Sequence, residues 1–185
     1  MNRRTALVLI TTQAGLLWLA ANGFAAKDKK TGQNTLEGGK IKVYSAEQGD
    51  YILTDKVMRS DSEWEKLLTS EQYHVLREEG TERAFTGDLL KNKDHGVYRC
   101  AACGNDLYLS ASKFDSGTGW PSYYEPIAKE NVSIREDRSF FVTRNELICS
   151  RCDSHLGHVF DDGPPPTGKR HCINSISLEF HKLNK

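Results

Sequence analysis

The sequence lacks an excess of charge of either sign, because 25 Lys and Arg residues balance 25 Asp and Glu residues. Proteins that bind nucleic acid usually carry a basic excess, so the balance gives no electrostatic case for nucleic acid as a partner. An internal repeat of about 20–50 residues is also absent, which argues against a solenoid or a propeller. The composition, with 38% hydrophobic and 27% charged residues, is typical of a soluble globular domain.

The sequence also lacks an apolar run of the length, about 20 residues, that a stable membrane helix needs. A shorter run, Thr5–Ala21, follows Arg3 and Arg4 and precedes small residues that end at Ala25. This order predicts an export signal over residues 1–25, and the arginine pair also resembles a twin-arginine signal. The alternative is an uncleaved segment that anchors the protein in the membrane.

Removal of residues 1–25 takes away two arginines and no acids, so the net charge of the remaining chain falls from zero to −2. We expect an exported protein of the bacterial periplasm or cell envelope, without stable membrane association once the signal is cut. Residues 26–58 are rich in Lys, Gly, Gln and Thr and show little periodicity, which predicts a flexible linker. The functional domain is then expected over residues 59–183.

Two short helices are predicted at the start of this domain. Ser60 and Glu63 have the spacing of a capping box, and a second helix is expected to begin with Ser70 as its cap. From Val97 onward the sequence changes to short β-like runs, and residues 176–180 alternate as a half-buried strand does. Residues 136–138 are expected to form a hairpin turn before a further strand at 139–143. These patterns predict an antiparallel β domain with two helices before it, a mainly β fold of the α+β class.

Four of the five cysteines form two C-x2-C pairs, Cys100 with Cys103 and Cys149 with Cys152. Two tight turns of this kind can supply four sulfur ligands in a tetrahedron, the geometry of a structural Zn2+ site. The alternatives are two disulfides, which an exported protein permits, or two redox-active pairs. We favour zinc, because a disulfide within C-x2-C closes too small a loop to stabilise the chain much.

The fifth cysteine, Cys172, has no such partner. Arg170 shares its face if the segment is a strand, and a guanidinium there would favour the nucleophilic thiolate. A buried structural cysteine is the alternative. His155 and His158 offer two imidazoles for proton transfer near neutral pH, and Trp120 on a glycine-rich loop can form the wall of a small apolar pocket. The acids of residues 161–168 are interpreted as solvated turn residues.

The combination of these motifs resembles the B-type methionine sulfoxide reductases, over about Ser60–Phe180. The motifs that carry the resemblance are the two C-x2-C pairs, Thr81–Gly87, Phe114–Ser122, His155–Phe160 and Arg170–Ser175. The family implies a barrel-like core of antiparallel sheets with peripheral helices and a structural Zn2+ held by Cys100, Cys103, Cys149 and Cys152. It reduces the R epimer of methionine sulfoxide in peptides and proteins, and so repairs oxidative damage.

The resemblance also implies roles for individual residues. Cys172 would be the nucleophile that becomes a sulfenic acid, Trp120 would take the substrate methyl group, and Arg170 would activate the thiolate. His155, His158 and Asn174 would line the pocket and handle protons, with His158 as the first choice for the proton donor. A monomer is expected. The rival interpretations are a zinc-binding interaction module without catalysis and a Cys-His hydrolase, which lacks its signatures here.

Two positions depart from the family pattern. Thr118 stands where many members carry a second cysteine that resolves the sulfenic acid. We therefore expect an external reductant, a thioredoxin-like protein or a small thiol, to regenerate Cys172. His171 stands where Tyr or Phe is frequent, and it is expected to add a positive charge beside Cys172 at low pH.

Overall fold

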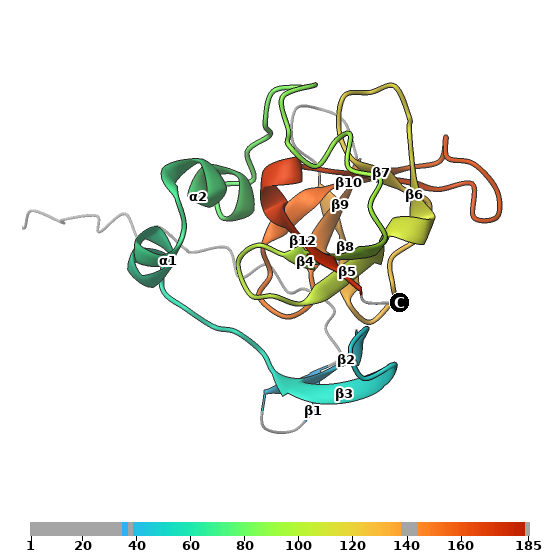
Figure 1. The fold of residues 1–185 in the computed structure, drawn as a ribbon. Coiled ribbons are helices and arrows are strands. Elements are labelled where there is room, and N and C mark those ends of the chain that lie inside the picture. Colours follow the sequence, from blue (N-terminus) through green and yellow to red (C-terminus); the bar gives the residue numbers. More distant parts are fainter. Residues whose placement is uncertain (1–34, 37–38, 138–143, 184–185) are drawn as a thin grey trace, which may run out of the picture. The chain divides into compact units, whose positions relative to one another are not determined.

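The computed structural model describes residues 35–36, 39–137 and 144–183. In these ranges the chain is mainly β, as predicted (Figure 1). The first sheet has the order β1-β2-β3, with β1 at Thr35–Leu36, β2 at Lys40–Ser45 and β3 at Asp50–Asp55. The predicted export signal, residues 1–25, lies outside the described residues. Within them, no helix is both long and apolar enough to span a membrane.

Residues 40–55 are not a flexible linker, which corrects the sequence interpretation. Ile41 and Val43 alternate on the buried face of β2, and Gly49 at φ +66° completes the turn into β3. The buried Asn131 fastens this hairpin: its side chain accepts from the Tyr44 N–H and donates to the Tyr44 carbonyl, both at 2.8 Å. The alternation of apolar residues was too short to stand out beside the many polar residues around it.

Two short helices follow, as the capping patterns predicted. Helix α1 spans Asp61–Leu67, and the Glu63 carboxylate accepts from the backbone N–H of Ser60 at 2.8 Å. Helix α2 spans Ser70–Leu76, but its N-cap is Thr69 rather than Ser70, because the Thr69 hydroxyl accepts from the Gln72 N–H at 3.1 Å. Thr69 and Gln72 form a second capping box, which satisfies backbone groups at the helix start.

The large sheet has the order β6-β7-β11-β10-β9-β8, and every pair of neighbours in it is antiparallel. A smaller antiparallel sheet has the order β12-β4-β5. The strands of the large sheet are β6 (Lys113–Phe114), β7 (Ser122–Tyr123), β8 (Val132–Asp137), β9 (Arg144–Cys149), β10 (His155–Phe160) and β11 (Arg170–Ile173). Those of the smaller sheet are β4 (Gly96–Cys100), β5 (Asp106–Leu109) and β12 (Leu178–Lys182). The described residues also include two 3-10 turns, η1 (Ser110–Ser112) and η3 (Ser175–Ser177).

Two local predictions were wrong. Residues 136–137 do not form a turn, because β8 continues through Asp137, which pairs with Arg144 of β9. The cross-strand ion pair between these two side chains, at 2.9 Å, stabilises the extended register. Ser177 belongs to η3 and the strand begins only at Leu178, so the alternating run is shorter than predicted. The strand expected at 139–143 lies outside the described residues.

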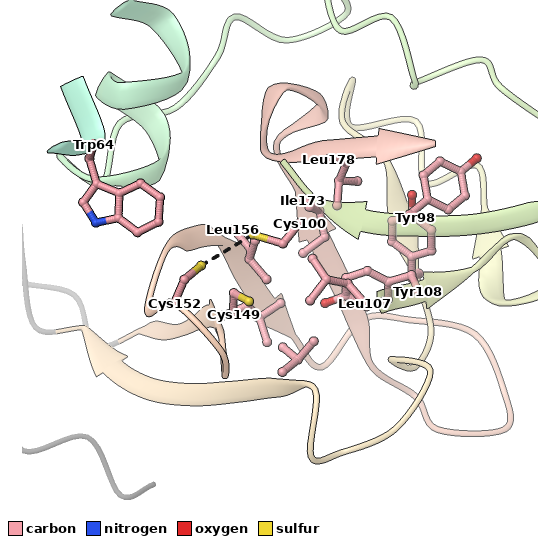
Figure 2. Close-up of a cluster of buried hydrophobic side chains, with 13 residues drawn as sticks. Trp64, Tyr98, Cys100, Leu107, Tyr108, Cys149, Cys152, Leu156, Ile173 and Leu178 are labelled. Atoms are coloured by element: carbon pink, nitrogen blue, oxygen red, sulfur yellow. Dashed lines mark hydrogen bonds between the residues drawn. The ribbon is translucent and has the colours of Figure 1, made fainter. Parts of the chain in front are cut away.

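The core lies between the six-stranded sheet and the β12-β4-β5 sheet, and it receives Trp64 from α1 (Figure 2). Tyr108 and Tyr123 stack with ring centroids 4.3 Å apart, and Tyr98 meets Tyr123 edge to face at 5.2 Å. Such aromatic pairs contribute roughly 0.5–1.5 kcal/mol each beyond the area that they bury. The core therefore fixes the inner face of β11, whose other face carries Cys172.

Candidate active site and metal centre

The four paired cysteines meet in the core, as predicted. Cys100 ends β4 and Cys149 ends β9, so the fold brings the two C-x2-C turns together from separate sheets. All four Sγ atoms lie within 4.8 Å of one another, with 3.7 Å between Cys100 and Cys152 and 3.6 Å between Cys103 and Cys149. Figure 2 shows Cys100 and Cys152 facing each other, with Cys149 beside them.

These sulfur positions fit a tetrahedral ion. Zn–S bonds of about 2.3 Å place the sulfurs of a tetrahedral site about 3.8 Å apart, close to the observed separations. A disulfide needs about 2.05 Å, and all five cysteines of the chain are free. Burial raises the pKa of the Cys149 thiol well above its usual value, so the thiolates need a cation to compensate their charge. The four cysteines can therefore hold a metal ion.

Cys172 lies on β11, directly opposite His158 on the antiparallel neighbour β10. Opposed residues of this kind place their side chains on the same face of a sheet, with Cβ atoms about 4.5–5.5 Å apart. Both side chains line a cavity of about 160 Å³, together with Asn174 and Trp120. The other lining residues are Thr81, Arg144, Gly157 and Phe160. The structure thus joins four of the predicted catalytic and substrate-binding residues in one small cavity.

A β-bulge in β10 brings His155 toward His158. Residues three apart on a regular strand point to opposite faces, but here the register shifts between His155 and Gly157. The extra residue re-aims the chain, and the two imidazole centroids come within 5.4 Å. Gly157 has φ +155°, and a Cβ on it would lie 1.9 Å from the Cys172 carbonyl oxygen. Only glycine permits this close approach of β10 to the strand that carries Cys172.

A carboxylate contacts each of the two histidines, and the one at His155, Glu146, is buried. The Glu146 carboxylate accepts from His155 Nδ1 at 2.8 Å and from Arg135 at 2.6 Å and 2.8 Å. Burial opposes the ionisation of Glu146, yet these hydrogen bonds outweigh it and lower the pKa of Glu146. Glu146 is therefore an anion that fixes the His155 ring. Sequence reasoning missed this residue, which no motif around it would have indicated.

His158 is the more accessible of the two histidines, and its Nε2 lies 3.3 Å from Asp137 Oδ2. Burial lowers the pKa of His158, although the hydrogen bond to Asp137 partly opposes this effect. The imidazole is therefore neutral at neutral pH. The contact at Nε2 assigns the N–H to that nitrogen and leaves Nδ1 as a proton acceptor.

Arg170 shares a face with Cys172, as predicted, but its charge has another partner. Its guanidinium donates to both oxygens of Asp162, at 2.8 Å and 2.9 Å, and lies 4.4 Å from the centroid of the Phe160 ring. Asp162 is a solvated turn residue, as predicted, because its side chain is 63% exposed, and it also pairs with Arg170. The turn of residues 161–168 brings Asp162 and Arg170 close together, and this placement could have predicted the ion pair from the sequence.

The Cys172 thiol does not have the lowered pKa that the sequence suggested. Burial raises its pKa, and the Arg170 charge and the Thr118 hydroxyl, 4.0 Å from Sγ, only partly offset burial. Burial outweighs these two effects, and the nearby Asp162 charge adds a small upward contribution to the Cys172 pKa. In the free protein at neutral pH, both the Cys172 thiol and the His158 imidazole are therefore neutral.

The remaining predicted residues have positioning contacts. Asn174 accepts from the Glu82 N–H at 3.1 Å and donates to the Leu156 carbonyl at 3.1 Å, which fastens the bulge of β10. The Trp120 indole donates to the Glu82 carbonyl at 3.1 Å, which fixes the ring at the cavity. The Glu82 carboxylate in turn accepts from the Ser175 and Ile176 N–H groups. One loop thus holds both cavity walls.

His171 does not place a charge beside Cys172, which corrects the expectation for this position. It points to the opposite face of β11, where Nδ1 lies 3.1 Å from the Tyr108 hydroxyl. Burial lowers the pKa of His171 to about 4, with a smaller contribution from Lys169. The side chain is therefore a neutral core residue at neutral pH.

Comparison with known proteins agrees with this site. Residues 68–182 match the family model described as the SelR domain. A peptide methionine sulfoxide reductase MsrB of Methanosarcina barkeri is 62% identical over 124 residues, which cover 67% of this chain and 87% of that protein. One of Hahella chejuensis is 55% identical over 130 residues, covering 70% of this chain and 94% of that protein. The chain belongs to the family of B-type methionine sulfoxide reductases.

Proposed function

We propose that the protein reduces the R epimer of methionine sulfoxide in peptides and proteins to methionine, and so repairs oxidised proteins. The observation that carries the proposal is the cavity in which Cys172 lies opposite His158 beside the Trp120 indole. The cavity of about 160 Å³ suits one side chain rather than a larger ligand. Membership of the family and the relatives named for this activity support the reaction.

The first step forms a bond between Sγ of Cys172 and the sulfoxide sulfur. The thiol proton passes to Nδ1 of His158, and the thiolate attacks the electrophilic sulfur while the imidazolium protonates the sulfoxide oxygen. The hydroxyl group then moves from the methionine sulfur to Sγ as the bond between the two sulfurs breaks. Methionine leaves, Cys172 is a sulfenic acid, and one oxygen atom has been transferred.

An external thiol regenerates the enzyme in this proposal. The thiol sulfur attacks Sγ of the sulfenic acid, a mixed disulfide forms, and water leaves. A second thiol releases Cys172 as the free thiol and carries away the disulfide. Thr118 supports this route. It stands where many family members carry the resolving cysteine, and its hydroxyl oxygen, 4.0 Å from Sγ of Cys172, cannot form a disulfide. A thioredoxin-like protein or a small thiol would serve as the reductant.

Epimer-resolved turnover tests the activity. The wild type, with dithiothreitol, should consume only the R epimer of N-acetylmethionine sulfoxide, and Cys172→Ser should consume neither epimer. A non-catalytic zinc module would make Cys172→Ser equal to the wild type. Mass spectrometry after one turnover without reductant should find one added oxygen on Cys172; an internal disulfide of Cys172 would refute the external route.

We also propose that the metal is Zn2+ in a structural role. Four thiolates leave no coordination position open, and the cysteines join β4 of one sheet to β9 of the other. Elemental analysis should give one zinc per chain, and Cys149→Ser should lower both the zinc content and the melting temperature. Full occupancy by another metal, or none in the folded protein, would contradict the assignment.

The location and assembly are also proposals. The charged start, apolar run and small residues of segment 1–25 support export to the periplasm or cell envelope, and an uncleaved anchor is the alternative. The expected monomer is a separate proposal. Mass measurement of the protein from fractionated cells distinguishes the two. A mature chain that begins near residue 26 in the soluble envelope fraction supports cleavage, and an intact chain in the membrane fraction supports the anchor.

A further inference from the structure

A second hollow adjoins the Trp120 side of the catalytic cavity. It has a volume of about 680 Å³, which is large enough for several residues of an extended peptide, and Trp120 lines both spaces. We call this hollow the basic groove. Its walls include Phe85, Leu90, Lys91, Lys93, Phe114 and Trp120. A polypeptide whose methionine side chain occupies the small cavity must place its neighbouring residues against a surface of this kind.

One wall of the basic groove is held in an unusual backbone conformation. Phe85 has φ +67°, which is rare for an aromatic residue, and its side chain is 69% exposed. Its N–H donates to the Gly119 carbonyl at 2.8 Å, and a Cβ on Gly119 would lie 2.9 Å from Phe85 and from Ala84. The two loops therefore lock together and present the ring to solvent beside Trp120. Strain of this kind is typical of ligand-binding positions.

The charge of the groove has one dominant sign. Lys91 and Lys93 are exposed, and neither has an ion-pair partner in the part of the chain that the structure describes. Lys113 is turned inward, since its Nζ donates to the Leu90 and Asn92 carbonyls at 2.7 Å and 2.9 Å. One acid, Asp115, lies among the lining residues, and its carboxylate accepts from the Gly117 N–H. The free positive charges suit a carboxylate.

A further hollow, which adjoins the catalytic cavity at Thr81, has different charges. Its volume is about 990 Å³, and its lining includes Glu71, Asp88 and Glu179 against one arginine, Arg83. A carboxylate next to the oxidised methionine is therefore favoured toward Trp120 and disfavoured toward Thr81. The two hollows together give the substrate a direction.

We propose that the basic groove binds the residues on one side of the oxidised methionine in a polypeptide substrate, and that it selects Asp or Glu there through Lys91 and Lys93. This inference rests on the proposed function and adds its sequence preference. The methylene groups of the bound Asp or Glu side chains would lie against Phe85 and Phe114, while Lys91 and Lys93 stay at the edge of the groove in contact with solvent. The preference is then electrostatic and should weaken as salt rises.

Blocked pentapeptides with the R-sulfoxide at the centre test this inference in the full chain. Two aspartates or two lysines are placed before or after the oxidised residue, and kcat/KM is measured with dithiothreitol at low and high salt. For one of the two sides, the aspartate peptide should exceed its lysine counterpart by roughly three- to tenfold at low salt, a range that follows from weak surface ion pairs. The other side should show no such advantage.

Two charge-matched double variants complete the experiment. Lys91→Glu with Lys93→Glu should reverse the aspartate preference, while Lys66→Glu with Lys129→Glu, which changes exposed lysines outside the groove, should keep it. Two results would refute the proposal that the groove binds substrate: equal kcat/KM for all peptides in the wild type, or an equal loss of the aspartate preference in both double variants. If the wild type reduces N-acetylmethionine R-sulfoxide but shows no charge preference among the peptides, the proposal for the groove is refuted and the proposed function stands. Failure on that short substrate would refute the proposed function as well.

Discussion

Gly157→Ala offers the sharpest test of the geometry that joins the two histidines to Cys172. The new Cβ would lie 1.9 Å from the Cys172 carbonyl oxygen, whereas real Cβ contacts are essentially never below 3.0 Å. The two strands must therefore separate by about 1 Å, or the bulge must change shape. Crowding of this kind costs about 1–3 kcal/mol, and the strained φ adds about 1–3 kcal/mol. We expect a loss of about 4 kcal/mol in the free energy of unfolding.

The activity should fall further than the stability. The strand separation moves Cys172 away from His158, and a misplacement of about 1 Å can cost about 100-fold in rate. Urea denaturation and kcat on the R epimer at a temperature where the variant stays folded measure the two effects. Gly49→Ala is the matched control, because Gly49 has φ +66° with no atom within 4 Å of a new Cβ. If both variants lose equal stability and Gly157→Ala keeps its rate, the close approach of β10 to β11 is not what positions the nucleophile.

Three further predictions follow from the charges and the packing. Because the folded pKa of His171 is about 4 and the unfolded value is about 6.5, protonation favours the unfolded chain, and stability should fall by about 3 kcal/mol as pH drops from 6.5 to 4. His171→Phe should flatten this part of the unfolding free energy against pH; an unchanged slope would contradict the assignment. Alkylation of Cys172 by iodoacetamide should have a midpoint above the ordinary thiol value, and Arg170→Met should raise it further; a lower midpoint in the variant would contradict the role of Arg170. Asn131→Ala should cost about 2–4 kcal/mol and expose residues 40–55 to hydrogen exchange, since two buried hydrogen bonds to Tyr44 are lost; protection equal to that of the wild type would contradict the role of Asn131.

Several local features of the chain could be predicted from the sequence, because each depends on residues that are only a few positions apart. The capping box at Ser60 and Glu63 and the two C-x2-C turns each follow from neighbours in the sequence. The hairpin of residues 40–55 was missed although its alternation was present, because only Ile41 and Val43 are buried on β2 and polar residues surround them. Its stability comes from Asn131, far along the chain.

The sequence by itself determined the mainly β class and the four sulfurs that can hold an ion, because residue type and short-range periodicity are enough for these. The role of Cys172 as a nucleophile was implied only by the resemblance to the family. Only the tertiary structure determined the protonation of those groups and the side chains that surround them. Burial sets the direction of the Cys172 and His158 pKa values and outweighs the effect of the Arg170 charge on the thiol, and Arg170 also pairs with Asp162. The bulge in β10 turns His155 toward His158, which regular alternation forbids. Desolvation and strand register are properties of the packed chain, so no local pattern could have supplied them.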